Sequence, residues 1–177
     1  MKNFIMALTY SRIISGPFIF IFSVFFNLYF LSFILFLVSA ITDYFDGFLA
    51  RKFSHETNVG KLLDPIADKM IFCSSIFAIV LITQDYFIGF MGMIMLLREF
   101  WVSGLREFTA LNNISSASDV TFLAKLKTAL QFLSISLFFF SFSYDLSLGI
   151  FISSFTLFLS LLVSLKTALN YSDNSFK

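Results

Sequence analysis

The sequence predicts an all-α integral membrane protein, a bundle of six transmembrane helices, and three observations support this fold class. Of the 177 residues, 58% are hydrophobic, only 13% are charged, and the mean hydropathy is +0.89. The apolar stretches are continuous rather than alternating, and helices satisfy their own backbone polar groups in lipid. At about 20 residues per span, the stretches suffice for about six crossings. We therefore interpret residues 1–177 as one membrane domain with a polar tail over about 171–177.

The first apolar stretch is too long for a single span. It runs without a charge from Ile13 to Thr42, which at ~1.5 Å per residue would overshoot a ~30 Å hydrocarbon core. We therefore predict a hairpin near Asn27 and Leu28. No small-x-small cleavage site precedes the second helix, so we interpret the first as a permanent span rather than a signal peptide. The predicted spans are 4–26, 29–50, 61–83, 87–109, 120–143 and 146–168.

Charge is distributed unevenly between the two ends of these spans. Six spans place both termini on one side, and every Lys and Arg fits that side, whereas the opposite turns carry only Asp85 and Asp145. The positive-inside rule therefore places both termini in the cytoplasm, in a multi-pass protein of the cell (inner) membrane. The net charge of +1 argues against a nucleic-acid partner, and the lone Cys73 excludes an intrachain disulfide.

Two consecutive helices carry acidic and small residues on one face each. Residues three or four apart share a helix face, and here these are Asp43, Asp46, Gly47 and Ala50, followed by Gly60, Asp64 and Asp68. Carboxylates at membrane depth need cations, protons or metal ions. Oxygen ligands favour Mg²⁺ or Mn²⁺, and two such ions ~4 Å apart can clamp a displacement at phosphorus. Solvated aspartates paired with nearby basic residues, and an ion or proton pathway, are the alternatives.

The spacing of these residues resembles a known signature. Asp43-x-x-Asp46-Gly47-x-x-Ala50-Arg51, eight further residues, and Gly60-x-x-x-Asp64-x-x-x-Asp68 are similar to the signature of the CDP-alcohol phosphatidyltransferases. That family consists of six-helix membrane enzymes, usually dimeric, which transfer a phosphatidyl-type group from a CDP-linked lipid to an alcohol. The resemblance implies that Asp43, Asp46, Asp64 and Asp68 hold two Mg²⁺ or Mn²⁺ ions, and that Asp68 is also the base. It further implies CDP-lipid contacts from Thr9, Gly47, Arg51, Thr57 and Gly60.

Other segments resemble the bacterial phosphatidylglycerophosphate synthases within this family. They are the segment from Arg98-Glu99 to Arg106 and Lys125-Leu-Lys127-Thr128, while Leu8-Thr9-x-x-Arg12 is similar to the entry segment of the family as a whole. This resemblance implies CDP-diacylglycerol and glycerol 3-phosphate as substrates and CMP as a product. Arg12 lies inside the first span, where snorkelling to the interface and pairing with the carboxylates are both open.

A physical consideration points to a phosphorylated acceptor. Four cations lie near the predicted cytoplasmic ends of the fourth and fifth spans, and we expect them to bind the acceptor phosphate: Arg98, Arg106, Lys125 and Lys127. Glycerol 3-phosphate needs such donors, whereas serine, choline and ethanolamine do not. Inositol phosphate satisfies the same charge requirement. Alternatively, the four cations only set the topology or bind anionic membrane lipids.

Overall fold

The computed structural model contains six helices, which account for nearly all of the described residues. Residues 2–53, 58–112 and 122–175 are described, with the backbone alone at residues 2–6, 44–53, 58–62 and 174–175. The helices are α1 (Lys2–Val24), α2 (Tyr29–Phe53), α3 (Asn58–Thr83), α4 (Tyr86–Leu111), α5 (Phe122–Ser143) and α6 (Ser147–Ser175). The predicted all-α fold class is confirmed.

The helices are those of a multi-pass membrane protein. Among the described residues, five helices are long and apolar enough to cross a membrane, and in α2 the apolar part covers Tyr29–Asp43. Each predicted span coincides with one helix. The predicted polar tail over about 171–177 begins as a continuation of α6, which remains helical to Ser175. This extension packs against α4, where Trp101 Nε1 donates to Ser172 Oγ at 3.0 Å.

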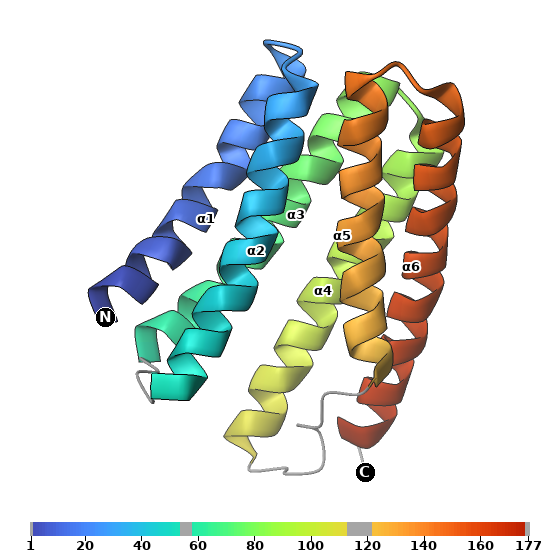
Figure 1. The fold of residues 1–177 in the computed structure, drawn as a ribbon. Helices are drawn as coiled ribbons and strands as arrows, with labels where there is room; N and C mark the ends of the chain where they lie inside the picture. Colours follow the sequence, from blue (N-terminus) through green and yellow to red (C-terminus); the bar gives the residue numbers. More distant parts are fainter. Residues whose placement is uncertain (1, 54–57, 113–121, 176–177) are drawn as a thin grey trace.

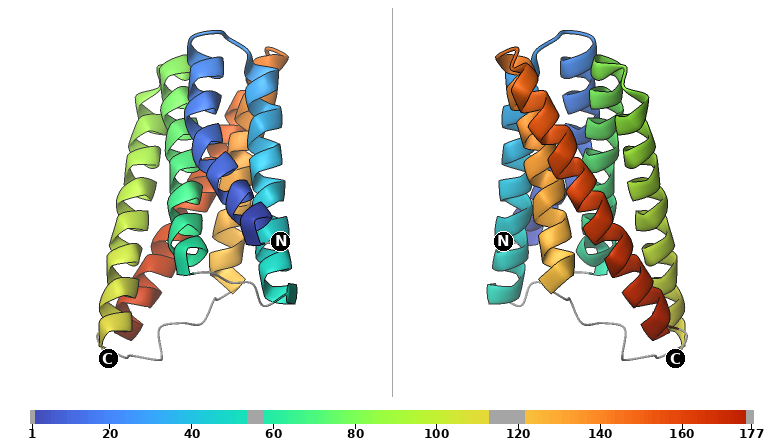
Figure 2. Two further views of the ribbon diagram at one scale, coloured as in Figure 1. Left: turned by 90° about the vertical axis from the view of Figure 1, so that its left-hand side faces the viewer. Right: turned by 90° about the vertical axis from the view of Figure 1, so that its right-hand side faces the viewer.

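The bundle consists of two groups of three helices. Helix α1 packs on α2 and α3, and α6 packs on α5 and α4, while α2 and α3 join the groups through contacts with α5 and α4. Figure 1 shows the start of α1 and the end of α6 at the same end of the bundle. Figure 2 shows α6 running obliquely from α5 across to α4. Buried Phe36, Ile71, Met91 and Phe138 belong to the core that the groups share.

Short turns close the bundle at the other end (Figure 1). Each has one residue in the left-handed region, with φ of 53° at Asn27, 52° at Gln84 and 52° at Asp145. One such residue reverses the chain after a helix, and Asn and Asp adopt this conformation most readily after Gly. The predicted hairpin near Asn27 is thereby confirmed. Asp85 caps α4, because its Oδ1 accepts the backbone N–H of Phe87 at 2.7 Å.

Small residues bring neighbouring helices close together, as is common in membranes. The hydroxyls of Ser15 and Ser39 join α1 to α2 at 2.8 Å. Gly92 of α4 faces α3 so closely that a Cβ at this position would lie 2.4 Å from Ile76 Cγ2. The β-branched Ile76 has little rotamer freedom in a helix, so the contact between α3 and α4 depends on the absence of a side chain at Gly92.

We expect Gly92→Ala to lower the melting temperature of the detergent-solubilised protein relative to Gly104→Ala. Both substitutions lie in α4, where replacing Gly by Ala favours the helix by about 1 kcal/mol in each case. Only the Cβ at position 92 meets a neighbour, since a Cβ at Gly104 has nothing within 4 Å. Overpacking costs about 1–3 kcal/mol. Equal melting temperatures for the two variants would show that α3 and α4 separate there at no cost.

Candidate functional site

A cluster of three carboxylates and one guanidinium joins the first three helices. Arg12 of α1 donates to Asp64 Oδ1 at 2.9 Å and to Asp68 Oδ1 at 3.1 Å, both on α3, and it also binds Asp43 Oδ1 on α2. Thr9, one turn earlier on α1, donates to the same Asp64 oxygen at 3.0 Å. The predicted convergence of acidic residues from the second and third helices is therefore present for Asp43, Asp64 and Asp68.

Burial within this cluster is asymmetric. The Arg12 side chain is 1% exposed, whereas those of Asp43, Asp64 and Asp68 are 39%, 44% and 46% exposed. The guanidinium therefore lies beneath the carboxylates, which face outward. Snorkelling and pairing were both open for Arg12, and in the structure its guanidinium pairs with the three carboxylates. The packing of α1 on α3 holds this cation where the three Oδ1 atoms meet.

The carboxylates fit a divalent cation by their chemistry and charge. Among the described side chains, one guanidinium meets three carboxylates, and all the donors are hard oxygens, which Mg²⁺ and Mn²⁺ prefer. In the described residues, these oxygens converge on Arg12, and no group of three or more His, Cys, Asp or Glu side chains is arranged around a metal-sized space. The half-exposed carboxylates leave the outer side of the cluster accessible to an ion.

Several predicted site residues are described by their backbone alone. Asp46, Gly47 and Arg51 lie in the last turns of α2, within two or three turns of Asp43, and Gly60 lies in the first turn of α3. Their helices place them at the end of the bundle that holds the Arg12 cluster. Thr57 lies outside the described residues. The roles of all five remain predictions.

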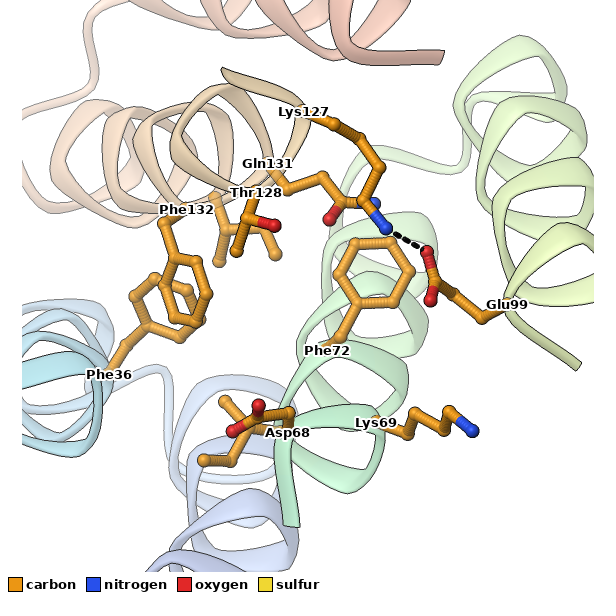
Figure 3. Close-up of a pocket in the computed structure, with 11 residues that line it drawn as sticks. Phe36, Asp68, Lys69, Phe72, Glu99, Lys127, Thr128, Gln131 and Phe132 are labelled. Carbon is orange, nitrogen blue, oxygen red and sulfur yellow. Dashed lines mark hydrogen bonds and ion pairs between the residues drawn. The ribbon is translucent and has the colours of Figure 1, made fainter. Parts of the chain in front are cut away.

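A cavity lies beside the carboxylate cluster, between α2, α3, α4 and α5. Asp68 and Lys69 line it on α3, Glu99 on α4 and Lys127 on α5, and aromatic rings complete the wall. Figure 3 shows Asp68 on one side, Lys127 on the opposite side, and Phe36, Phe72 and Phe132 between them. The cavity therefore places a cluster carboxylate opposite an ammonium group, with apolar surface between the two.

Glu99 connects two of the predicted acceptor-binding cations. Its Oε1 accepts from Arg98 Nη1 at 3.0 Å and from Lys127 Nζ. Arg98 also donates to α6, from Nε to the Ser164 carbonyl at 3.0 Å and from Nη2 to Thr167 Oγ1 at 2.7 Å. Arg98 is therefore held by protein groups on three sides, whereas Lys127 reaches the cavity wall.

The other two predicted acceptor-binding cations lie elsewhere. Arg106 is exposed on α4, with its guanidinium carbon 5.8 Å from the centre of the Tyr171 ring on α6. Lys125 is exposed on α5. Of the four cations, the structure brings Arg98 and Lys127 together, and only Lys127 is among the residues that line the cavity.

The cavity is also lined by three polar residues that the sequence does not predict for the site: Glu99, Lys69 and Gln131. A signal existed for Glu99, because an ionisable residue within a predicted span is a candidate functional residue by itself. Lys69 follows Asp68 directly, but it donates to Ser103 Oγ on α4 and lies 5.9 Å from the Phe100 ring centre. No pattern in the sequence distinguishes Gln131 from a lipid-facing polar residue.

Comparisons with known proteins show what this chain is similar to. The chain is 37% identical over 161 residues to a protein of Wigglesworthia glossinidia brevipalpis, covering 88% of each chain. It is 45% identical over 104 residues to one of Rickettsia typhi, covering 59% of this chain and 56% of the relative. An Escherichia coli K12 protein is 37% identical over 106 residues, covering 58% and 57%. With the latter two relatives, the match therefore covers little more than half of either chain.

All three relatives carry the name CDP-diacylglycerol–glycerol-3-phosphate 3-phosphatidyltransferase. In addition, a family model described as CDP-alcohol phosphatidyltransferase matches residues 3–165. This region includes the Arg12 cluster, the cavity and all six helices at least in part. The chain therefore belongs to the CDP-alcohol phosphatidyltransferase family.

Proposed function

We propose that this membrane enzyme transfers the phosphatidyl group from CDP-diacylglycerol to sn-glycerol 3-phosphate, giving phosphatidylglycerophosphate and CMP in phospholipid biosynthesis. The names of the relatives support this reaction. One observation in the structure supports this reaction most directly: the cavity has Asp68 of the carboxylate cluster on one wall and Lys127 on the other. An acceptor with a hydroxyl at one end and a phosphate at the other matches these two groups.

On the carboxylate side, Asp43, Asp46, Asp64 and Asp68 would hold two divalent ions, Mg²⁺ or Mn²⁺. When bound, such ions neutralise the pyrophosphate of the CDP-lipid and stabilise the CMP leaving group. Arg12 positions three of these carboxylates through their Oδ1 atoms. Thr9, Gly47, Arg51, Thr57 and Gly60 complete the proposed CDP-lipid site.

On the acceptor side, Asp68 accepts the proton of the attacking hydroxyl. The hydroxyl oxygen forms a bond to the phosphorus that carries the diacylglycerol, and the bond from this phosphorus to the CMP oxygen breaks. CMP leaves with the electron pair. Lys127 binds the acceptor phosphate at the opposite wall, so that the hydroxyl end faces Asp68. Arg98, Arg106 and Lys125 add positive charge around this end of the bundle.

The proposal includes an orientation and an assembly state. The site opens to the cytoplasm, where both termini lie, because neither CDP nor the acceptor phosphate crosses lipid and the basic residues favour that side. The protein forms a homodimer in the cell (inner) membrane, as the family resemblance implies. Labelling of single introduced cysteines in oriented vesicles tests the orientation, and the mass of the protein in nanodiscs tests the dimer.

We expect Lys127→Gln to raise the apparent KM for glycerol 3-phosphate by roughly ten- to a hundredfold, with little change for CDP-diacylglycerol. A charge-assisted contact contributes ~1.5–3 kcal/mol, and Lys127 lines the cavity. Lys125→Gln is the matched control, since Lys125 is exposed on the same helix and should change KM less than about threefold. Equal increases for both substrates would mean that Lys127 does not bind the acceptor.

An acceptor panel tests the proposed function. Purified protein receives labelled CDP-diacylglycerol, a divalent ion and one acceptor at a time: glycerol 3-phosphate, inositol phosphate, serine or phosphatidylglycerol. We expect labelled product with glycerol 3-phosphate in large excess over the others. Product with inositol phosphate alone would still agree with a cationic cavity that binds a phosphate, but it would contradict glycerol 3-phosphate as the acceptor. Product with serine or phosphatidylglycerol alone would contradict the role of Lys127 as well.

A further inference from the structure

Glu99 is a partly buried carboxylate that the proposed reaction does not use. Its side chain is 21% exposed and lines the cavity, and a single oxygen, Oε1, accepts from both Arg98 and Lys127. The two cations are 8% and 10% exposed. Burying two cations around one carboxylate is costly unless the three charges are fixed by further contacts.

Those further contacts come from α6. Arg98 donates to the Ser164 carbonyl and to Thr167 Oγ1, and Thr167 Oγ1 in turn donates to the Ser164 carbonyl at 2.8 Å. Contacts with α6 therefore fix Arg98, and Arg98 holds the Glu99 carboxylate at the cavity wall. At the other end of this chain of contacts, Lys127 lines the cavity, where a ligand can reach it (Figure 3).

We propose that Glu99 is an internal substitute for the acceptor phosphate and determines which anions the cavity accepts. The inference rests on the proposed function. The Glu99 carboxylate gives Lys127 an anionic partner before an acceptor is present, which orients the flexible lysine side chain. An incoming anion must then share Lys127 with Glu99 or displace Glu99 from it. A phosphate dianion offers more charge than Glu99 supplies, whereas a monoanion such as a carboxylate offers no more.

Glu99→Gln tests this role because glutamine keeps the size and one acceptor oxygen but removes the charge. Glu107→Gln is the matched control, since Glu107 is an exposed acid on the same helix. The melting temperature of each detergent-solubilised protein is measured in sodium chloride, sodium phosphate and sodium acetate at equal ionic strength. We expect phosphate and acetate to stabilise Glu99→Gln more than wild type or Glu107→Gln, because only that variant has buried cations without their carboxylate.

Kinetics give a second readout that a merely structural role would not produce. In Glu99→Gln the apparent KM for glycerol 3-phosphate should fall about tenfold, the size of one competing charge-assisted hydrogen bond, while that for CDP-diacylglycerol changes less than about twofold. Acetate should become a competitive inhibitor against glycerol 3-phosphate. A raised KM for glycerol 3-phosphate, or equal stabilisation of all three proteins by phosphate, would overturn the proposal.

A second variant covers the case in which Glu99→Gln does not fold. In Glu99→Asp the carboxylate is one methylene shorter, so we expect it to reach Lys127 less well. We expect the same changes in phosphate response and KM, but smaller, and no change at all would overturn the proposal. If wild type transfers nothing to glycerol 3-phosphate, the proposed function fails, while the phosphate-dependent melting temperatures still decide whether Glu99 substitutes for an anion.

Discussion

Replacing Asp68 by Asn is expected to lower the rate of phosphatidyl transfer at least ~100-fold while the protein stays folded and still binds CDP-diacylglycerol in part. General-base catalysis contributes ~10²–10⁴ in rate, and an amide accepts no proton at neutral pH. Asp68 is suited to this role because it belongs both to the Arg12 cluster and to the cavity wall. The rate is measured with labelled CDP-diacylglycerol, and binding is measured separately with the unreactive variant.

Two further variants sharpen this result. Asp64→Asn should abolish transfer and also weaken CDP-lipid binding, because a neutral amide does not replace a carboxylate that would hold a divalent ion. Asp64 contacts Arg12 and Thr9 and does not line the cavity. Asp85→Asn should be fully active, since Asp85 caps α4 at the opposite end of the bundle and Asn is an equally good cap. Activity of Asp68→Asn above about a tenth of wild type would exclude it as the base. Complete loss of CDP-lipid binding would make it chiefly a metal ligand.

Replacing Arg12 by Gln is expected to lower the melting temperature in a metal chelator by roughly 5–10 °C. Breaking a buried ion pair costs about 3–5 kcal/mol, and 1 kcal/mol shifts the melting temperature of a chain of this size by about 2–4 °C. Water around the half-exposed carboxylates reduces the cost. Without Arg12, the carboxylates of Asp43, Asp64 and Asp68 lose the guanidinium that all three contact.

Added Mg²⁺ should restore most of the stability of Arg12→Gln, because a divalent ion supplies the missing positive charge. Arg12→Lys is the control. It keeps the charge, but one ammonium group does not span three separate carboxylates as a guanidinium does, so its melting temperature should lie between those of wild type and Arg12→Gln. An Arg12→Gln variant as stable as wild type in chelator, or insensitive to Mg²⁺, would show that the cluster needs no cation.

The helices and the carboxylate cluster were accessible from the sequence because both depend on local spacing. Hydropathy locates the spans, and a period of three or four residues places Asp64 and Asp68 on one face of α3. The hairpin at Asn27 follows from the length of the first apolar stretch. The extension of α6 to Ser175 was not accessible, since hydropathy does not indicate whether a polar segment is helical, and the contact of Ser172 with Trp101 on α4 is tertiary.

The partners of the buried charges depend on tertiary packing, which spacing does not determine. Arg12 would snorkel equally well from a face of α1 turned toward lipid, and the packing of α1 on α3 brings Arg12 to Asp64 and Asp68. Glu99 meets Lys127 from another helix, and Arg98 is fixed by α6 at Ser164. These contacts join residues far apart in the chain, so no periodic pattern in the sequence predicts them.

The most direct test of the proposed reaction is the release of CMP from CDP-diacylglycerol by the detergent-solubilised wild-type protein, which has no two compartments between which to transport an ion. We expect CMP only when glycerol 3-phosphate and Mg²⁺ or Mn²⁺ are both present, in an amount equal to the phosphatidylglycerophosphate formed. Omission of either should reduce the release to background. If no acceptor yields CMP under these conditions, while proteoliposomes containing the protein accumulate a divalent ion, the proposed reaction is contradicted.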